Sequence, residues 1–514
     1  HGNVWVGSEL NYIFEFDTKN DKLINYELPS RYLEVDKSND NIGARRKTIY
    51  NITQKNENLI CGSDGGLLFF DLNKKVFNRV FNFDENNRYN NRVKCFANSN
   101  DSNYLMFGTW GGLVKLNLSN SSYSIEKKSE TSINSLSSDK ISCIFKDKQS
   151  NLWVGTEENG LNIYFNSLNK FPLYNKSNGL DNDFIYSIYQ LNNKNILIGT
   201  EDGLYNLNPQ SNAVTNYNSI LKKYKINTVL SLLEDKSGNI WIGSYGQGIV
   251  IYNPTTKKET KILADKNSGG TVMKMIQDKS GVIWVATYKD GLYSINPNTL
   301  NIRRYTTLQG LPTNNIYFVY ENKEDNTLIV GTDGGGLCIL NFVTSVEKPF
   351  ITVFKHIDNR NSISSNSVNN IYKDKDGIFW IATSNGLNKF DLKKKNFTVY
   401  SEKDGLPNSY IYDVIPDKNN NLWLPSNFGL TKFNPNTKNE SGSAFKNYNT
   451  NDGIQAREFN QGASFLCKDG KILVGGINGL NYFDPLSIKE STITPNSYIY
   501  SYSRQGKDID SDSS

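Results

Sequence analysis

The chain has 514 residues, of which 57 are basic and 52 acidic, and 37% of its residues are apolar. This length exceeds the size at which one hydrophobic core keeps growing, so we expect two or more domains. The even charge balance, without a long basic block, argues against nucleic acid as a partner, and no apolar run reaches the roughly 18 residues of a membrane helix.

A pattern centred on a large apolar residue, often tryptophan, recurs along the chain. One copy, "DKSGNIWIGSYGQGIVIYNP" (235–254), reads as a turn, a strand, a glycine turn and a second strand. A period of about 45 residues with several short strands per unit is typical of β-propeller blades. Eleven copies align on the tryptophan position, at Trp5, Ile60, Met106, Trp153, Leu197, Trp241, Trp284, Ile329, Trp380, Trp423 and Leu473.

Each unit divides into four expected strands, which in this copy cover 226–235, 240–244, 248–254 and 258–263. The apolar residues alternate with period two and Gly or Asn-Pro recurs too often for a helix. A tryptophan in the second strand can fill the wedge between neighbouring blades. We therefore expect burial between blades at Trp153, Trp241, Trp284, Trp380 and Trp423.

The expected fold is all-β, with tandem β-propellers. Residues 1–175 hold the last four blades of a first propeller whose opening blades are missing. Residues 176–487 hold seven units, which make a complete ring of ordinary size. In residues 488–514 the repeat stops, and alternating Tyr and Ile in "ITPNSYIYSYSRQGKDID" indicate the start of a different β domain.

Several stretches resemble a known repeat. "DKQSNLWVGTEENGLNIYF" (147–165) and "DKDGIFWIATSNGLNKFD" (374–391) are similar to the two-component-regulator propeller repeat, found in sensor regions of bacterial hybrid two-component systems. The inter-blade segments "QGLPTNNIYFV" (309–319) and "DGLPNSYIYDV" (404–414) resemble the family's connection. The closing unit, 457–485, resembles its last blade, and the tail resembles the start of its Tyr-rich, immunoglobulin-like domain.

The resemblance implies a place in a larger receptor. In that family two seven-bladed propellers precede the immunoglobulin-like domain, a membrane helix and a signalling output such as a histidine kinase. Three blades would then be missing upstream, fourteen minus eleven. The chain would be the extracytoplasmic part, periplasmic or on the cell surface, of a membrane-anchored homodimer. It would detect oligosaccharides from glycan breakdown, or another small ligand, to control gene expression, and the membrane would be reached only through a segment absent here.

Catalytic chemistry finds little support in the composition. Histidine occurs only as His1 and His356, so a His-based triad or a His-rich metal site could be assembled only around His356, and we expect no cofactor, no metal and no enzymatic activity of this fragment. The repeated turn Asp is more easily a turn-former than a catalyst; its copies are Asp147, Asp235, Asp278, Asp374 or Asp376, and Asp417. The five cysteines, widely spread, are expected to be buried strand residues: Cys61, Cys95, Cys143, Cys338 and Cys467.

Two alternative functions remain open. A propeller glycoside hydrolase or polysaccharide lyase would need two carboxylates facing each other across the scissile bond. The candidate carboxylates outside the repeated turn are Glu158, Asp333, Asp404 and Glu458. A WD40-type scaffold ranks last, because the Gly-His and Trp-Asp dipeptides that mark it are absent.

A ligand is expected on the face of the second propeller that carries the Gly-Leu-Pro connections, which we call the loop face. Sugars bind aromatic rings through their C–H faces and amide or charged groups through hydrogen bonds, and variable loop positions supply this mixture. Of these residues, Tyr410, Phe428 and Arg457 should matter most for signalling, because the C-terminal domain that starts near Thr494 would lean there. The candidate residues are Tyr245, Tyr288, Lys289, Asp333, Asn385, Tyr410, Asn427, Phe428, Arg457 and Asn478.

Overall fold

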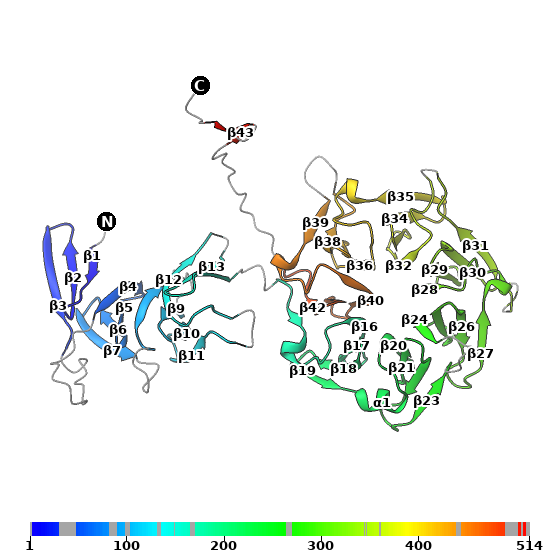
Figure 1. The fold of residues 1–514 in the computed structure, drawn as a ribbon, viewed down its shortest axis with the longest axis horizontal. Helices are drawn as coiled ribbons and strands as arrows, with labels where there is room; N and C mark the ends of the chain where they lie inside the picture. Colours follow the sequence, from blue (N-terminus) through cyan, green and yellow to red (C-terminus); the bar gives the residue numbers. More distant parts are fainter. Residues whose placement is uncertain are drawn as a thin grey trace. The chain divides into compact units, whose positions relative to one another are not determined.

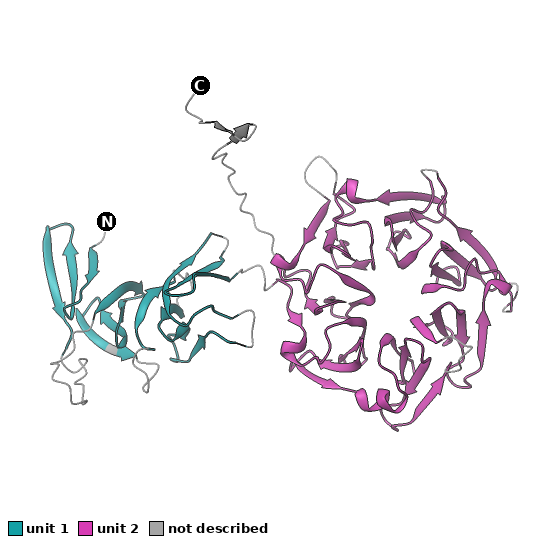
Figure 2. Cartoon of the chain, in the orientation of Figure 1, with its two compact units in different colours: residues 1–166, 491–514 teal, residues 167–490 magenta. Residues whose placement is uncertain are grey.

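The computed structural model divides the chain into two units, residues 1–166 with 491–514, and residues 167–490 (Figure 2). Strands arranged in small antiparallel sheets dominate both units (Figure 1). The predicted all-β, tandem-propeller class is confirmed. The structure describes residues 3–29, 48–81, 90–97, 103–130, 135–148, 150–164, 170–263, 270–343, 345, 347–358, 361–437, 444–488, 502–504 and 507–509.

Unit 2 (167–490) is a closed ring of seven four-stranded antiparallel blades (Figure 1). We number the blades 1 to 7 in chain order and give the strands of each. Blade 1 consists of β16 (Ile185–Gln190), β17 (Ile196–Thr200), β18 (Gly203–Asn208) and β19 (Ala213–Asn216); blade 2 of β20 (Val229–Glu234), β21 (Ile240–Ser244), β22 (Ile249–Tyr252) and β23 (Glu259–Ile262); blade 3 of β24 (Thr271–Gln277), β25 (Ile283–Tyr288), β26 (Gly291–Ile295) and β27 (Ile302–Tyr305); and blade 4 of β28 (Ile316–Asn322), β29 (Thr327–Thr332), β30 (Leu337–Asn341) and β31 (Phe350–Phe354). Blade 5 consists of β32 (Val368–Lys373), β33 (Phe379–Thr383), β34 (Gly386–Asp391) and β35 (Asn396–Tyr400); blade 6 of β36 (Ile415–Pro416), β37 (Leu422–Ser426), β38 (Gly429–Phe433) and β39 (Phe445–Tyr448); and blade 7 of β40 (Phe459–Leu466), β41 (Ile472–Gly476), β42 (Gly479–Phe483) and β15 (Leu173–Tyr174). A short helix, α1 (Asn218–Lys223), connects blades 1 and 2.

The ring closes because a strand from its N-terminal end completes the last blade. The outer strand of blade 7 is β15, which pairs antiparallel with β42 through Leu173 with Asn481 and Tyr174 with Leu480. Just before β15, the buried ring of Phe171 lies 4.9 Å from that of Phe483, centroid to centroid. Unit 2 therefore extends from residue 167 to residue 490, beyond the predicted range 176–487 at both ends.

Within residues 1–166 of unit 1, the described residues form four sheets of three, four, four and three strands. Residues 488–514, predicted to start a new domain, lie almost wholly outside the described residues, apart from the paired strands β43 (Tyr502–Arg504) and β44 (Lys507–Ile509). The strands of unit 1 are β1 (Val4–Gly7), β2 (Tyr12–Asp17), β3 (Lys22–Glu27); β4 (Ile49–Lys55), β5 (Asn58–Ser63), β6 (Gly66–Asp71), β7 (Val76–Phe81); β8 (Val93–Phe96), β9 (Tyr104–Thr109), β10 (Gly112–Asn117), β11 (Tyr123–Glu126); and β12 (Ile141–Lys146), β13 (Leu152–Thr156), β14 (Leu161–Tyr164).

The repeated turn Asp and the slot tryptophan form one structural device. In each of five blades the indole Nε1 donates a hydrogen bond to the Asp carboxylate six residues earlier, over 2.7 to 3.1 Å. The same carboxylate accepts backbone amides of its own turn, as Asp235 does from Ser237 and Asn239. The carboxylate thus holds the turn and orients the ring that fills the wedge.

The predicted burial holds for four of the five tryptophans. Trp241, Trp380 and Trp423 are at most 2% exposed and Trp284 is 7% exposed. The prediction was wrong for Trp153, which is half-buried, and for Cys143, which is exposed. Both lie in the sheet β12–β14, which has three strands among the described residues and leaves Phe145 and Leu161 exposed as well.

Short 3₁₀ turns shape the connections between blades. Thr306 and Ser401 each cap one such turn, and glycines at φ +103° and +121° (Gly310, Gly405) end it. A backbone with positive φ favours glycine, which explains the Gly-Leu pair of these connections. The following Leu is buried and anchors the connection to the ring.

Candidate functional site

The first strand of each blade lines the centre of unit 2 (Figure 1). In blades 1 to 5 the pairing of this first strand with the second strand contains a bulge, in which the register shifts across two residues near the start of the strand, for example between Val272 and Lys274. In blade 7, β40 contains a longer shift. A bulge re-aims side chains and commonly occurs at the rims of closed sheets. In blades 1 to 5 it occurs at the same point of the strand, and the residue between the two shifted positions is Tyr186, Leu230, Met273, Tyr317 or Asn369. Tyr412 and Asn460 occupy the corresponding positions of the sequence in blades 6 and 7.

Side chains of this inner ring tie neighbouring blades together. The amide of Asn369 donates to the carbonyl of Ile411 over 2.7 Å, and that of Asn460 donates to Ile185 over 2.9 Å. The second of these bonds joins the last blade to the first. The inner rim is therefore cross-linked across blade boundaries, which favours a stiff ring.

An aromatic cluster lies at the loop-face end of blades 3, 4 and 6. The rings of Tyr288 and Tyr317 stack 6.1 Å apart at an interplanar angle of 15°. Burial raises the pKa of the Tyr317 phenol, and the carboxylate of Asp333 raises it further. The pKa of Tyr410 is raised in the same way, first by burial and then by Asp333, so one carboxylate acts on two phenols. Asp333 itself accepts a hydrogen bond of 2.6 Å from the Ser367 hydroxyl.

A second group of loop residues adjoins this cluster through Tyr412, whose ring centroid is 5.0 Å from that of Tyr410. The Tyr412 hydroxyl donates to the side-chain oxygen of Asn427. Next to Asn427, the ring of Phe428 is 49% exposed, and the guanidinium of Arg457 lies 4.8 Å from its centroid. The two groups make one aromatic and polar surface on the inner part of the loop face, which we call the aromatic rim.

Six of the ten predicted site residues belong to the aromatic rim, and four do not. Lys289 borders it, with its ammonium 5.4 Å from the Tyr288 ring. Tyr245 is 67% exposed in blade 2. Asn385 and Asn478 donate their amides to backbone carbonyls of neighbouring connections, Ser364 and Gln455, so their role is to hold those connections.

Polar side chains continue into the centre of the ring. A small cavity of about 20 Å³, room for about one water molecule, is lined by Lys274, Tyr317, Asn369 and Gln461 among others. The buried Asn369 Oδ1 and Gln461 Nε2 atoms have no hydrogen-bond partner within the part of the chain that the structure describes. They are a complementary acceptor and donor, so one water molecule could satisfy both.

A buried carboxyl group and an amine also face this centre. Burial raises the pKa of Asp413 to about 6, opposed by the positive charge of Lys274. Burial lowers the pKa of Lys274, and Asp413 opposes that shift in turn. Sequence reasoning missed both residues and also Tyr317. The available signal was a departure from the blade pattern, since Lys274 and Asp413 occupy the position where blades 1 and 2 carry Ser187 and Ser231.

The four candidate catalytic carboxylates are distributed over separate places. Glu158 lies in unit 1 and forms an ion pair with Lys140. Asp404 accepts the amide of Ser401 over 2.8 Å and so completes a capping box. Asp333 and Glu458 both lie on the loop face, on connections of blades 4 and 7.

None of the helices in the described ranges is long and apolar enough to cross a membrane.

The comparisons with known proteins define the class. Residues 135–158 and 362–385 match the family model described as two component regulator propeller, and residues 166–362 match a domain of unknown function. The chain thus carries two-component-regulator propeller repeats, and the resemblance inferred from the sequence is confirmed.

Individual relatives agree with this class. "Histidine kinase P4" of Formosa agariphila is 23% identical over 313 residues, 58% of this chain and 22% of the kinase, so the chain spans about a fifth of that protein. Two extracellular domains from B. thetaiotaomicron share the fold. That of the hybrid two component system BT3049 has a TM-score of 0.68 at 24% identity, over 99% of this chain and 71% of the other. That of the one component system BT4673 has a TM-score of 0.52 at 19% identity, over 93% and 62%.

Proposed function

We propose that this chain is the sensor region of a transmembrane two-component signalling protein, that it faces away from the cytoplasm, and that it binds an oligosaccharide at the aromatic rim of unit 2. The observation that carries the proposal is the meeting of rings and polar groups from several blades at one end of the ring. The fold and repeat shared with extracellular domains of two-component systems support the sensor role.

The aromatic rim suits a sugar ligand by its chemistry. The faces of Tyr288, Tyr410 and Phe428 attract the positively polarised C–H groups of a sugar ring, because an aromatic face carries negative charge density. Arg457 can donate hydrogen bonds to hydroxyl groups and Asp333 can accept them. The rim binds such a ligand without altering it, and the signal is a shift between arrangements of two chains that differ in affinity for the ligand.

A thermal-shift screen with a panel of soluble oligosaccharides tests the proposal. A ligand at about 100 times its dissociation constant should stabilise unit 2 by about 2.7 kcal/mol. Tyr410→Ala and Arg457→Ala should abolish the stabilisation, whereas the matched control Tyr245→Ala, an exposed tyrosine outside the rim, should retain it. A panel without any stabilising member, or retained stabilisation in both rim variants, would contradict the site.

Product analysis of the same incubations separates a sensor from a hydrolase or lyase. We expect the oligosaccharides to be recovered intact. Cleavage that disappears in Asp333→Asn or Glu458→Gln would replace the sensor proposal with the enzymatic one. In the intact receptor, which we propose to be a homodimer with a histidine kinase or another signalling output, the two rim substitutions should silence the output without lowering the amount of folded protein.

A further inference from the structure

One amine in the centre of unit 2 has no hydrogen-bonding partner. Lys274 lies on the first strand of blade 3, at the position where blades 1 and 2 carry Ser187 and Ser231. Its ammonium lies 5.9 Å from the centroid of the Phe318 ring, and within the described residues it makes neither a hydrogen bond nor an ion pair. A charge that loses hydration without gaining partners lowers stability, and groups of this kind concentrate at functional sites.

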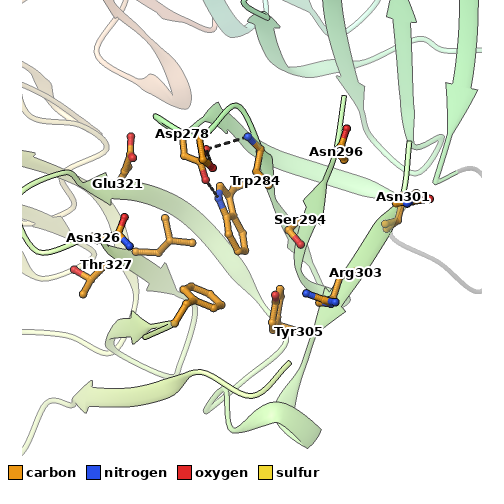
Figure 3. Close-up of a pocket in the computed structure, with 15 residues that line it drawn as sticks. Asp278, Trp284, Ser294, Asn296, Asn301, Arg303, Tyr305, Glu321, Asn326 and Thr327 are labelled. Atoms are coloured by element: carbon orange, nitrogen blue, oxygen red, sulfur yellow. Dashed lines mark hydrogen bonds between the residues drawn. The ribbon is translucent and has the colours of Figure 1, made fainter. Parts of the chain in front are cut away.

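Two carboxylates of the ring, by contrast, are held by hydrogen bonds. Asp278 accepts the indole of Trp284 over 2.7 Å and the backbone amide of Val282 over 2.9 Å (Figure 3). The buried carboxylate of Asp413 accepts the amide of the next residue over 2.7 Å. The nitrogen of Lys274 differs from these groups because it is available to a ligand.

The cavity beside Lys274 adds an unpaired donor and an unpaired acceptor. Its volume of about 20 Å³ has room for about one water molecule. Within the described part of the chain, Gln461 Nε2 lacks an acceptor and Asn369 Oδ1, in a side chain only 2% exposed, lacks a donor. A carbonyl oxygen placed there accepts from Gln461, and a hydroxyl group formed from it also donates to Asn369. Leu230 and Met273 line the same cavity and are partly exposed, so a short apolar molecule can approach the amine.

The charges at this centre decide which reaction of an amine fits. The negative charge of Asp413 acts on Lys274, since it opposes the lowering of the lysine pKa by burial. Acylation of Lys274, or carbamate formation with CO2, would remove the positive charge and leave the buried carboxylate without its counter-charge, which is costly. A Schiff base keeps that charge, because a protonated imine is as positive as the ammonium that it replaces. We propose that Lys274 is a reactive amine, which forms a Schiff base with a short aliphatic aldehyde in the centre of unit 2.

The proposed reaction balances within this cluster. The ammonium of Lys274 gives one proton to the carboxylate of Asp413, and the neutral nitrogen attacks the carbonyl carbon, so that a C–N bond forms and the C=O π pair passes to oxygen. A proton then moves from nitrogen to that oxygen and gives a carbinolamine. Its C–O bond breaks, the oxygen takes the proton from Asp413 and leaves as water, and the nitrogen keeps the positive charge of the iminium. Nothing is oxidised or reduced.

Two shifts in pKa support this chemistry. Burial lowers the pKa of Lys274, which raises the fraction of the neutral amine, the nucleophilic form. Burial raises the pKa of Asp413 to about 6, so this group can accept and return a proton near neutral pH.

Reductive trapping tests the inference on the parent chain, without requiring that a variant folds. The probes are acetaldehyde and propionaldehyde; sodium cyanoborohydride reduces an imine to a stable secondary amine, and peptide mass mapping locates it. Exposed lysines are almost wholly protonated at neutral pH, and each unit by which a pKa falls gives about ten times as much neutral amine. We therefore expect Lys274 to be alkylated at least about tenfold faster than the exposed Lys375. The matched control Lys375→Met should leave the rate at Lys274 unchanged.

A second reagent separates Schiff-base chemistry from a lowered pKa alone. Acetic anhydride needs only the neutral amine, whereas the imine also needs the acid and the iminium's counter-charge. Asp413→Asn should therefore lower the ratio of trapping to acetylation at Lys274 by at least about tenfold, since a positioned acid typically contributes more than that. Gln461→Leu removes the donor to the carbonyl oxygen and should lower the same ratio.

Two results would overturn the inference: Lys274 is trapped no faster than Lys375, or the ratio of trapping to acetylation stays unchanged in both variants. The inference does not depend on the aromatic rim. Its probes are not sugars, so a failure at Lys274 leaves the proposed function standing, and a rim that binds no oligosaccharide leaves the result at Lys274 unaffected.

Discussion

The Asp235–Trp241 pair offers a quantitative test of how the blades are held. Trp241 is completely buried, so Trp241→Ala should lower the free energy of unfolding of unit 2 by about 3–5 kcal/mol, as other large buried aromatics do. Trp241→Phe keeps most of the volume but loses the indole's hydrogen bond of 2.8 Å to the carboxylate. A bond to a charged acceptor contributes about 1.5–3 kcal/mol. We expect the lower end, since the same Asp235 oxygen still accepts the side-chain amide of Asn239.

A double-mutant cycle isolates the hydrogen bond from the packing. Trp241→Phe, Asp235→Ala and the double variant should give a coupling energy of about 1–2 kcal/mol, within the range for contacting residues. The assay is equilibrium unfolding in urea, with the transition of unit 2 followed by circular dichroism. The equivalent pair in blade 6, Asp417 and Trp423, should give a similar value. A coupling near zero in both blades would show that the tryptophan acts by volume alone and would refute the reasoning.

Three further outcomes follow from the structure. Because the pKa of Asp413 is raised from 3.8 to about 6, the folded state binds an extra proton between these values; stability should therefore rise as pH falls from about 6 to about 4, and a thermal melting series should lose this slope in Asp413→Asn. Phe171→Ala should lower the stability of unit 2 by about 3–5 kcal/mol although Phe171 precedes the predicted ring; an unchanged melting temperature would argue against the closure through β15. Trp153→Ala should lower the free energy of unfolding of unit 1 by much less than Trp241→Ala lowers that of unit 2, because Trp153 is only half-buried; urea unfolding with the transition of each unit followed separately checks this, and equal losses would contradict that burial.

The repeat period was enough to predict the architecture from the sequence, because each blade repeats one turn and one slot residue. It could not reveal β15: a two-residue strand, Leu173–Tyr174, carries no pattern of its own and is identified only by its partner β42. Nor could it show that the sheet holding Trp153 leaves one side open. Burial of a slot residue depends on the neighbouring blade as well as on its own.

The candidate site was predictable only in part. Tyr288, Asp333 and Tyr410 occupy variable loop positions and were found by that criterion. Tyr317 and Lys274 were missed because the bulge in the first strand turns their side chains toward the centre of the ring. The simple alternation of apolar and polar residues does not predict such a bulge. Asn385 looked equally available in the sequence, yet its amide is bonded to a backbone carbonyl. Exposure at a turn therefore predicts position better than it predicts a free hydrogen-bonding group.

The pairing of β15 with β42, which closes unit 2, also determines how the ring responds to mechanical load. The segment that enters the ring through Phe171 and the one that leaves after Phe483 belong to the same blade. Since β15 and β42 are antiparallel, tension between these ends opens their two residue pairs one after the other instead of shearing them together. Blades 1 to 6 are not on the path between these two ends, so the tension does not act on them directly. Under load, blade 7 should therefore be the first blade to open.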